Sequence, residues 1–195
     1  VVAVQELSRA PGSLSHNYSY RLESALGPNW QIVKPTSGWN ENYFFVRKGI
    51  EVEQIADLIL PSAKGGRHMT RIKITKDKKT VYFGSTHLVS GKNEDAARAQ
   101  QLQRIVDHID SSWIVLGDLN QDHIVPALIR THKMVRLNMA NSATKWNTYA
   151  KYSEKKLKQV KGKFIDHIIV PIEAKLKGYN LVGVDVATGE LSQPR

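Results

Sequence analysis

Residues Trp113 to Asn120 read Trp-Ile-Val-Leu-Gly-Asp-Leu-Asn. An apolar run of strand type reaches Gly117 and then presents two oxygen-bearing side chains, Asp118 and Asn120, two positions apart. Because alternate residues of a strand project from the same face, both side chains leave the strand's end together. A carboxylate and an amide at such a tip suit a hard metal ion or a phosphate, although the same residues also form ordinary Asx turns.

Three other segments have the same form, an apolar run that delivers a polar side chain. The first ends in Glu6, the second ends in His87, and the third, rich in β-branched residues, contains Asp166. A carboxylate inside an apolar strand is costly to bury unless it is paired, so Asp166 is expected to orient a histidine or to bind metal. Together the four segments predict a site built at the edge of a sheet.

Length and composition describe one ordinary globular domain. The 195 residues are 41% hydrophobic and 24% charged, and this length predicts a single domain over residues 1–195. No apolar stretch approaches the roughly 20 residues of a membrane-spanning helix. The sequence contains no cysteine, which excludes disulfides and thiolate metal sites but leaves both a secreted and a cytoplasmic location open.

The net charge of +10, from 28 Lys and Arg against 18 Asp and Glu, favours a polyanionic partner. Nucleic acid is the first expectation and an anionic lipid surface the second. Residues 151–163 concentrate six lysines against one glutamate. Beside an active site, such a segment would contact backbone phosphates through Lys155, Lys156 and Lys158, although a solvated loop can have the same composition.

The periodicity of the sequence predicts alternating strands and helices. Asn93 is expected to cap a long helix, and residues 69–74 and 80–86 are expected to pair as a hairpin. Mixed strands with covering helices predict an α+β sandwich, in which two mixed sheets pack face to face with helices outside. The full set of expected elements is strands at residues 1–6, 30–33, 42–47, 69–74, 80–86, 113–116 and 164–170, and helices at 20–26, 94–109 and 125–132.

Four short motifs, taken in order, resemble the endonuclease/exonuclease/phosphatase superfamily, and they span most of the chain. The motifs are Gln5-Glu6, Thr86-His87-Leu88, Gly117-Asp118-Leu119-Asn120 and Ile165-Asp166-His167-Ile168. The resemblance implies a four-layer α/β/β/α sandwich and a Mg²⁺-dependent hydrolase, with Mn²⁺ or Ca²⁺ as alternative ions. It implies that Glu6 and Asp118 hold the metal. His87, Asp118, Asn120 and Asp166 would be catalytic.

Residues 39–47 resemble the deoxyribonuclease I-type branch of that superfamily. This second resemblance implies that Glu41 is also catalytic and orients His87 through a hydrogen bond within roughly 3.2 Å. It further implies that Trp39 lies against the nucleic-acid groove and that Arg67 contacts a phosphate.

The sequence departs from the family pattern at both ends. The family normally has an asparagine-bearing strand before the Gln-Glu motif and a Ser-Asp-His motif near its end. Here five residues precede Glu6 and the sequence stops at Arg195. The chain is therefore expected to be incomplete at both ends and to have reduced activity, because the members of a catalytic unit fail together.

These features predict a monomeric Mg²⁺-dependent phosphodiesterase, a deoxyribonuclease-like endonuclease that hydrolyses nucleic acid, most readily DNA, with low sequence specificity. Two alternatives stay open. One is a phosphoinositide or phospholipid phosphatase or phosphodiesterase of the same superfamily. The other is a non-catalytic module of this fold that binds nucleic acid or a protein.

Overall fold

The computed structural model describes residues 1–7, 18–37, 41–62, 66–121, 134–136 and 165–171. The predicted helix at 125–132, Trp39, and the lysines of residues 151–163 lie outside these ranges. In the part of the chain that is described, no helix is long and apolar enough to cross a membrane.

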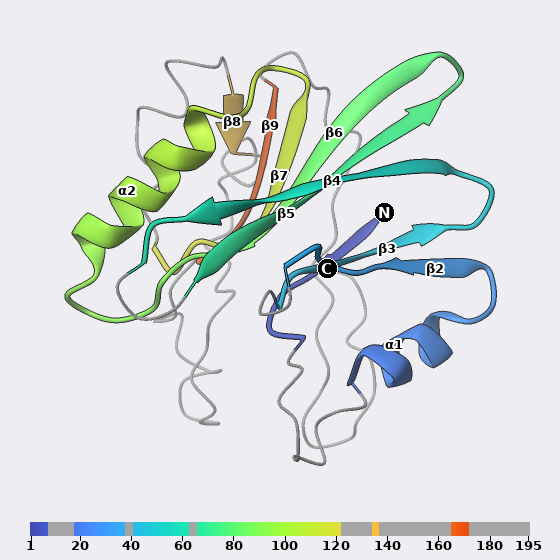
Figure 1. Cartoon of the computed structure of the whole chain (residues 1–195), viewed down its shortest axis with the longest axis horizontal. Helices are drawn as coiled ribbons and strands as arrows, with labels where there is room; N and C mark the ends of the chain where they lie inside the picture. Colours follow the sequence, from blue (N-terminus) through green and yellow to red (C-terminus); the bar gives the residue numbers. More distant parts are fainter. Residues whose placement is uncertain (8–17, 38–40, 63–65, 122–133, 137–164, 172–195) are drawn as a thin grey trace, which may run out of the picture.

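The described strands form two sheets (Figure 1). The smaller sheet is antiparallel and has the order β1 (Val2–Val4), β3 (Tyr43–Arg47), β2 (Trp30–Val33). The larger sheet has the order β4 (Glu51–Leu60), β5 (Arg67–Lys76), β6 (Lys79–His87), β7 (Trp113–Asp118), β9 (Asp166–Pro171), β8 (Met134–Arg136). It is mixed, because β6 and β7 run parallel whereas its other neighbouring strands are antiparallel.

Strand β3 is buried on both faces and joins two layers of the core. Its residues Phe44 and Val46 pack with Ile72 and Ile74 of β5, between the two sheets. Its residues Tyr43 and Phe45 point the other way and pack in a cluster that includes Leu22 and Leu26 of helix α1 (Tyr18–Leu26). Because successive residues of a strand point to opposite faces, β3 buries apolar side chains on both faces of the small sheet.

Helix α2 (Asp95–Val106) covers the opposite face of the large sheet. Leu102 and Ile105 of α2 pack with Trp113 and Val115 of β7, at helical spacing on one side and alternate strand positions on the other. Figure 1 shows α1 and α2 at opposite sides of the two sheets. The layers are therefore α1, small sheet, large sheet and α2, which is the predicted four-layer α/β/β/α sandwich.

Most predicted elements are present with shifted ends, and the structure differs from the prediction in three further respects. Strand β4 is not predicted by periodicity, because it is an edge strand with many charged residues and its register with β5 shifts between Ile55 and Leu58. Asn93 does not cap α2: Glu94 occupies the cap position, and no side chain makes the capping hydrogen bond. The helix also ends at Val106 rather than at residue 109.

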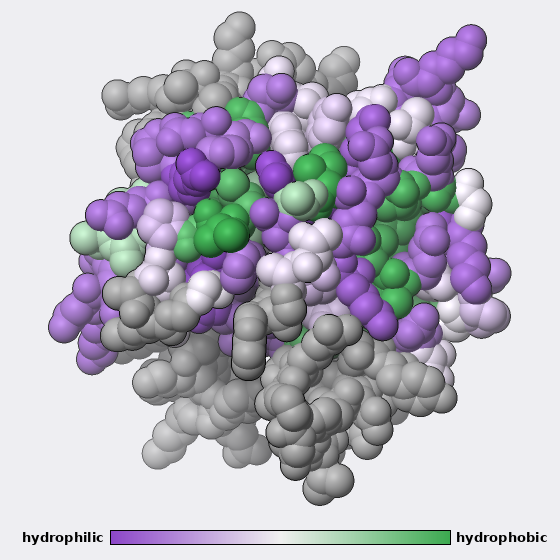
Figure 2. Space-filling view, viewed as in Figure 1, coloured by the Kyte–Doolittle hydropathy of each residue, from purple (hydrophilic) through white to green (hydrophobic). Residues whose placement is uncertain are grey.

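Hydrophilic side chains predominate on the face drawn in Figure 2, with apolar side chains in separate small patches. Among the described residues, the exposed large hydrophobic ones are Val1, Ile59 and Ile168. Scattered exposed apolar residues of this kind are ordinary for a folded domain.

Candidate active site

The register of the large sheet places three predicted site residues side by side. His87 at the end of β6 pairs with Asp118 at the end of β7, and Asp118 pairs with Asp166 at the start of β9. Residues paired across neighbouring strands project to the same face. The row His87, Asp118, Asp166 is therefore produced by strand pairing, although 79 positions separate its first and last members in the sequence.

Gly117 allows β6 and β7 to come this close. A Cβ atom at residue 117 would lie 1.9 Å from the carbonyl oxygen of Thr86. Only glycine can therefore occupy the position next to Asp118 while Asp118 stays beside His87.

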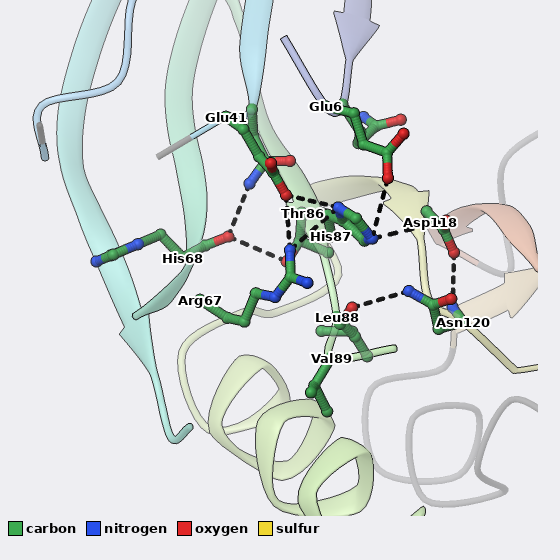
Figure 3. A network of polar contacts seen from close by, with 12 residues as sticks. Glu6, Glu41, Arg67, His68, Thr86, His87, Leu88, Val89, Asp118 and Asn120 are labelled. Atoms are coloured by element: carbon green, nitrogen blue, oxygen red, sulfur yellow. Dashed lines mark hydrogen bonds and ion pairs between the residues drawn. The ribbon is translucent and has the colours of Figure 1, made fainter. Parts of the chain in front are cut away.

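Glu41 lies against His87 from the other sheet. It directly precedes Asn42 and β3, and its Oε1 lies 2.7 Å from Nδ1 of His87. The hydrogen bond that the deoxyribonuclease resemblance implied is present, within the expected distance. Arg67, at the start of β5, donates from Nη1 to the same Oε1 at 2.6 Å (Figure 3).

These contacts determine which ring nitrogen of His87 carries a proton. A carboxylate can only accept, so Nδ1 must be protonated to bond Glu41. The 3.1 Å approach of Arg67 Nη1 to Nδ1 is then a close contact between two donor groups, not a hydrogen bond. Nε2 is left to face the remaining carboxylates, 3.8 Å from Oδ2 of Asp118 and 3.9 Å from Oε1 of Glu6.

The hydrogen bond from His87 lowers the pKa of Glu41 below its usual 4.5, and the nearby charges of His87 and Arg67 lower it further, against the opposing effect of burial. Glu41 is therefore held ionised as an acceptor. This is the state in which it can fix the orientation of the imidazole ring.

Glu6 follows β1 and has a left-handed backbone, with φ of 59°. Its neighbour Gln5 donates to the hydroxyl of Ser85 at 2.9 Å, which ties the small sheet to β6. The amide of Leu7 donates to the carbonyl of Glu41 at 3.1 Å. Both flanking residues are thus anchored, while the Glu6 side chain itself is 73% exposed. This arrangement presents a carboxylate to solvent at the edge of the site.

Asp118 and Asn120 form a compact turn after β7. The amide of Asn120 donates to Oδ1 of Asp118 at 2.7 Å, so the Asx-turn interpretation is correct for this pair. The Asn120 side chain donates to the carbonyl of Leu88 at 2.9 Å. Burial raises the pKa of Asp118 above its usual 3.8, and the charges of Asp166 and Glu6 add to the rise, against the lowering effects of the Asn120 amide and of His87.

The residues present fit a hard divalent cation. Carboxylate oxygens are the ligands that Mg²⁺, Mn²⁺ and Ca²⁺ prefer. Burial is the main cause of the raised Asp118 pKa, and repulsion from Asp166 and Glu6 adds to it; a bound cation would relieve that repulsion. Within the described ranges, however, no three His, Asp or Glu side chains are already grouped as an ion-binding set. Glu6 and Asp118 stay the predicted ligands.

The strand neighbour of Asp166, His167, is buried and its Nε2 contacts the carbonyl of Gln121 at 2.7 Å. It projects away from the row of site residues, as strand alternation predicts. Of the other predicted site residues, Trp39, Lys155, Lys156 and Lys158 fall outside the described ranges and stay predictions.

Sequence reasoning missed several groups that hold the site together. The backbone of Leu88, the Gln5–Ser85 hydrogen bond, and the buried polar side chains Arg98 and Gln101 of α2 all lie behind the predicted residues. The available signal was the position of Arg98 and Gln101 at i and i+3 on the apolar side of an amphipathic helix, where polar residues require partners.

Comparisons with known proteins give matches at the level of fold. No protein-family model and no curated protein sequence matches the chain. The structure is similar to D. rerio TDP2 complexed with a single-strand DNA product, with 15% identity and a TM-score of 0.61 over 97% of this chain and 80% of that one. It is also similar to the human nocturnin catalytic domain with bound sulfate, with 13% identity and a TM-score of 0.58 over 78% and 64%.

A third similar structure is the endonuclease domain of TRAS1, a telomere-specific non-LTR retrotransposon, with 10% identity and a TM-score of 0.51 over 75% of this chain and 68% of that one. All three proteins belong to the endonuclease/exonuclease/phosphatase superfamily. The chain therefore has the DNase I-like fold of the endonuclease/exonuclease/phosphatase superfamily, as its four motifs predict.

Proposed function

We propose that this protein is a divalent-metal-dependent phosphodiesterase that hydrolyses nucleic acid with low sequence specificity. The observation that carries the proposal is the arrangement around His87. Glu41 binds its Nδ1 at 2.7 Å, and its Nε2 faces the carboxylates of Asp118 and Glu6. An oriented imidazole beside acidic groups has the parts that phosphodiester hydrolysis needs.

The reaction requires an activated water, neutralisation of phosphoryl charge and help for the leaving oxygen. Glu41 fixes the proton on Nδ1, so His87 acts through Nε2, either holding a phosphoryl oxygen or passing a proton to it. Asp118, whose pKa is raised by burial, is better suited than an ordinary aspartate to accept a proton from water. Asn120 would bind a phosphate oxygen or the metal ion beside Asp118. Asp166 lies next to these two residues, because it pairs with Asp118 across β9 and β7.

Glu6 and Asp118 would hold the metal ion. A bound Mg²⁺, or Mn²⁺ or Ca²⁺ in its place, would neutralise charge on the phosphoryl group. Arg67 offers a second positive charge; it contacts Glu41 in this structure and would reach a substrate phosphate by rotating its side chain.

Nucleic acid is the favoured substrate class. The net charge is +10, the similar D. rerio TDP2 structure contains a single-strand DNA product, and the similar TRAS1 domain is an endonuclease. Trp39, Arg67, Lys155, Lys156 and Lys158 are proposed as contacts to the strand. Such contacts act mainly on the phosphate backbone, which accounts for low sequence specificity.

The test is cleavage of labelled single- and double-stranded DNA oligonucleotides by the full chain with Mg²⁺, Mn²⁺ or Ca²⁺. We expect metal-dependent cleavage that falls about 10²- to 10⁴-fold in His87→Ala. His108→Ala is the matched control, because His108 lies after the end of α2, where its Nδ1 makes an exposed contact with the carbonyl of Arg104, and this change should leave cleavage unchanged.

Binding gives a second readout. Affinity for duplex DNA should fall with salt at a log–log slope of about −0.9 per phosphate contact, and Lys155→Ala, Lys156→Ala and Lys158→Ala together should flatten that slope. Hydrolysis of phosphoinositide vesicles but not of DNA would replace the nuclease with the lipid alternative. DNA binding without hydrolysis under any of the three ions would favour a non-catalytic module.

A further inference from the structure

Two polar side chains are fully buried on the inner face of α2. Arg98 is 4% exposed and Gln101 is 0% exposed, among the apolar residues that pack α2 on the large sheet. Burying a charge and an amide in such surroundings is unfavourable unless both are hydrogen-bonded. Their partners therefore indicate why these residues are present.

Both side chains bind the same backbone unit. Gln101 accepts from the amide of Val89 at 3.0 Å, and Arg98 Nη1 donates to the carbonyl of Val89 at 3.0 Å. Arg98 Nη1 also donates to the carbonyl of Gly91 at 2.9 Å, and Gln101 Nε2 donates to the carbonyl of Pro61 at 2.7 Å. α2 thus satisfies both polar backbone groups of Val89.

The residue before Val89 binds the candidate site. The amide of Leu88 donates to the carbonyl of Asp118 at 2.9 Å, and its carbonyl accepts from the Asn120 side chain at 2.9 Å. Leu88 directly follows His87. Figure 3 shows Leu88 and Val89 leading from Asn120 toward a helix. We call residues 88–91 the strap, because they connect α2 to three site residues.

The strap begins where the pairing of β6 with β7 ends. β6 ends at His87 and β7 ends at Asp118, and the pairing between the two strands stops at these two residues. Beyond it, the separation between the two chain segments depends on the strap and on what holds the strap.

We propose that Arg98 and Gln101 are positioning residues for the phosphodiesterase reaction. Through the strap they set the position of Asn120 relative to His87, although neither touches the reacting atoms. The inference rests on the proposed function. Displacements of about 1 Å in a reacting geometry can cost roughly 10²-fold in rate, so a helix on the far face of the sheet can control catalysis in this way.

The test compares Arg98→Lys and Gln101→Glu with matched controls on the same helix. Lysine keeps the charge of Arg98 but lacks its planar fork of donors, and glutamate keeps the acceptor of Gln101 but cannot donate to Pro61. Arg104→Lys and Gln100→Glu make the same chemical changes at exposed positions of α2. The measurements are kcat and KM for DNA cleavage, the thermal midpoint, and hydrogen exchange of the Leu88 and Val89 amides.

We expect both inner-face variants to lower kcat about 10- to 100-fold with KM unchanged, and to speed exchange at Leu88 and Val89, while the controls match the wild type. A kcat that falls only in proportion to the unfolded fraction would reduce both residues to a structural role and overturn the proposal. So would unchanged kcat in a folded variant whose Val89 amide exchanges faster.

Failure of the proposed function is distinguishable from these outcomes. If the wild type cleaves no phosphodiester, the nuclease proposal fails at the first measurement. The strap is then assessed from amide exchange alone: unprotected Leu88 and Val89 amides in the wild type would overturn it directly, without any variant and without activity.

Discussion

Nδ1 of His87 lies 2.7 Å from Oε1 of Glu41, although the two residues are 46 positions apart and adjoin strands of different sheets. Glu41 leads into β3 of the small sheet, and His87 ends β6 of the large one. The hydrogen bond therefore crosses the sandwich. Because the apolar layer around Phe44 and Ile72 fixes the spacing of the two sheets, core packing directly determines the orientation of the imidazole ring.

Replacing Glu41 should impair catalysis without unfolding the protein. Glu41→Gln keeps the shape but removes the charge and lets the amide present a donor to Nδ1, so the fixed tautomer of His87 is lost. We expect kcat for DNA cleavage to fall by about 10- to 100-fold. The control is Glu53→Gln, since Glu53 forms an exposed ion pair with Lys73 and contributes little. Equal activity of the two variants would remove Glu41 from the mechanism.

The same carboxylate should make stability depend on pH. Folding lowers the Glu41 pKa from its usual 4.5, mainly through the hydrogen bond to His87. The resulting stabilisation is fully present above pH 4.5 and is lost as the pH falls through the lowered pKa of the folded state. In urea unfolding between pH 7 and pH 3, the stability difference between wild type and Glu41→Gln should therefore shrink below pH 4.5. A constant difference would contradict this assignment.

The contribution of Asp118 to stability should depend on pH in the opposite direction to that of Glu41. Burial raises its pKa above 3.8, so the folded state binds the proton more readily, and stability declines as pH rises through the raised pKa. Asp118→Asn keeps the acceptor for the Asn120 amide but removes the buried charge. Without divalent ions at pH 7, we expect its thermal midpoint to rise, by roughly 2–4 °C per kcal/mol gained, while activity is lost. A lower midpoint would show that the carboxylate stabilises the fold.

Metal binding should depend on Glu6. Its carboxylate is exposed at the edge of the site, beside Asp118, and Glu6→Gln removes a charged ligand. Titration calorimetry with Mg²⁺ or Mn²⁺ should give weaker binding in this variant than in the wild type, whereas Glu51→Gln, an exposed change on β4, should bind as the wild type does. Equal affinity in all three proteins would exclude Glu6 as a ligand.

Gly117 should tolerate no side chain. Alanine there would place Cβ 1.9 Å from the Thr86 carbonyl oxygen, which must separate β6 from β7 and move Asp118 away from His87. We expect destabilisation of about 1–3 kcal/mol or more in urea unfolding, together with loss of activity. Gly49→Ala is the comparison. Gly49 also has a positive φ, 84°, but a Cβ there meets nothing within 4 Å. Alanine at position 49 would therefore add backbone strain without a steric clash.

Much of the fold could be predicted from local patterns. The strand at Trp30–Val33, the hairpin of β5 and β6, and the apolar face of α2 follow from periodicity and turn residues. β4 could not be predicted in this way, because an edge strand with Glu51, Glu53 and Asp57 has no clear apolar alternation, and its pairing with β5 decides its structure.

Local sequence patterns identify the chemical groups of the site, since Glu6, His87, Asp118, Asn120 and Asp166 stand at the ends of short apolar runs whose period of two is a local property. The resemblance implied a hydrogen bond between Glu41 and His87, but it is the packing of the sheets that brings Glu41 to Nδ1, lets Arg67 share the same oxygen, and places Arg98 and Gln101 against the backbone behind the site. These contacts join residues from different sheets or from opposite faces of one sheet. Their distances are set by how the apolar layers pack, and packing is a property of the whole chain that no local pattern encodes.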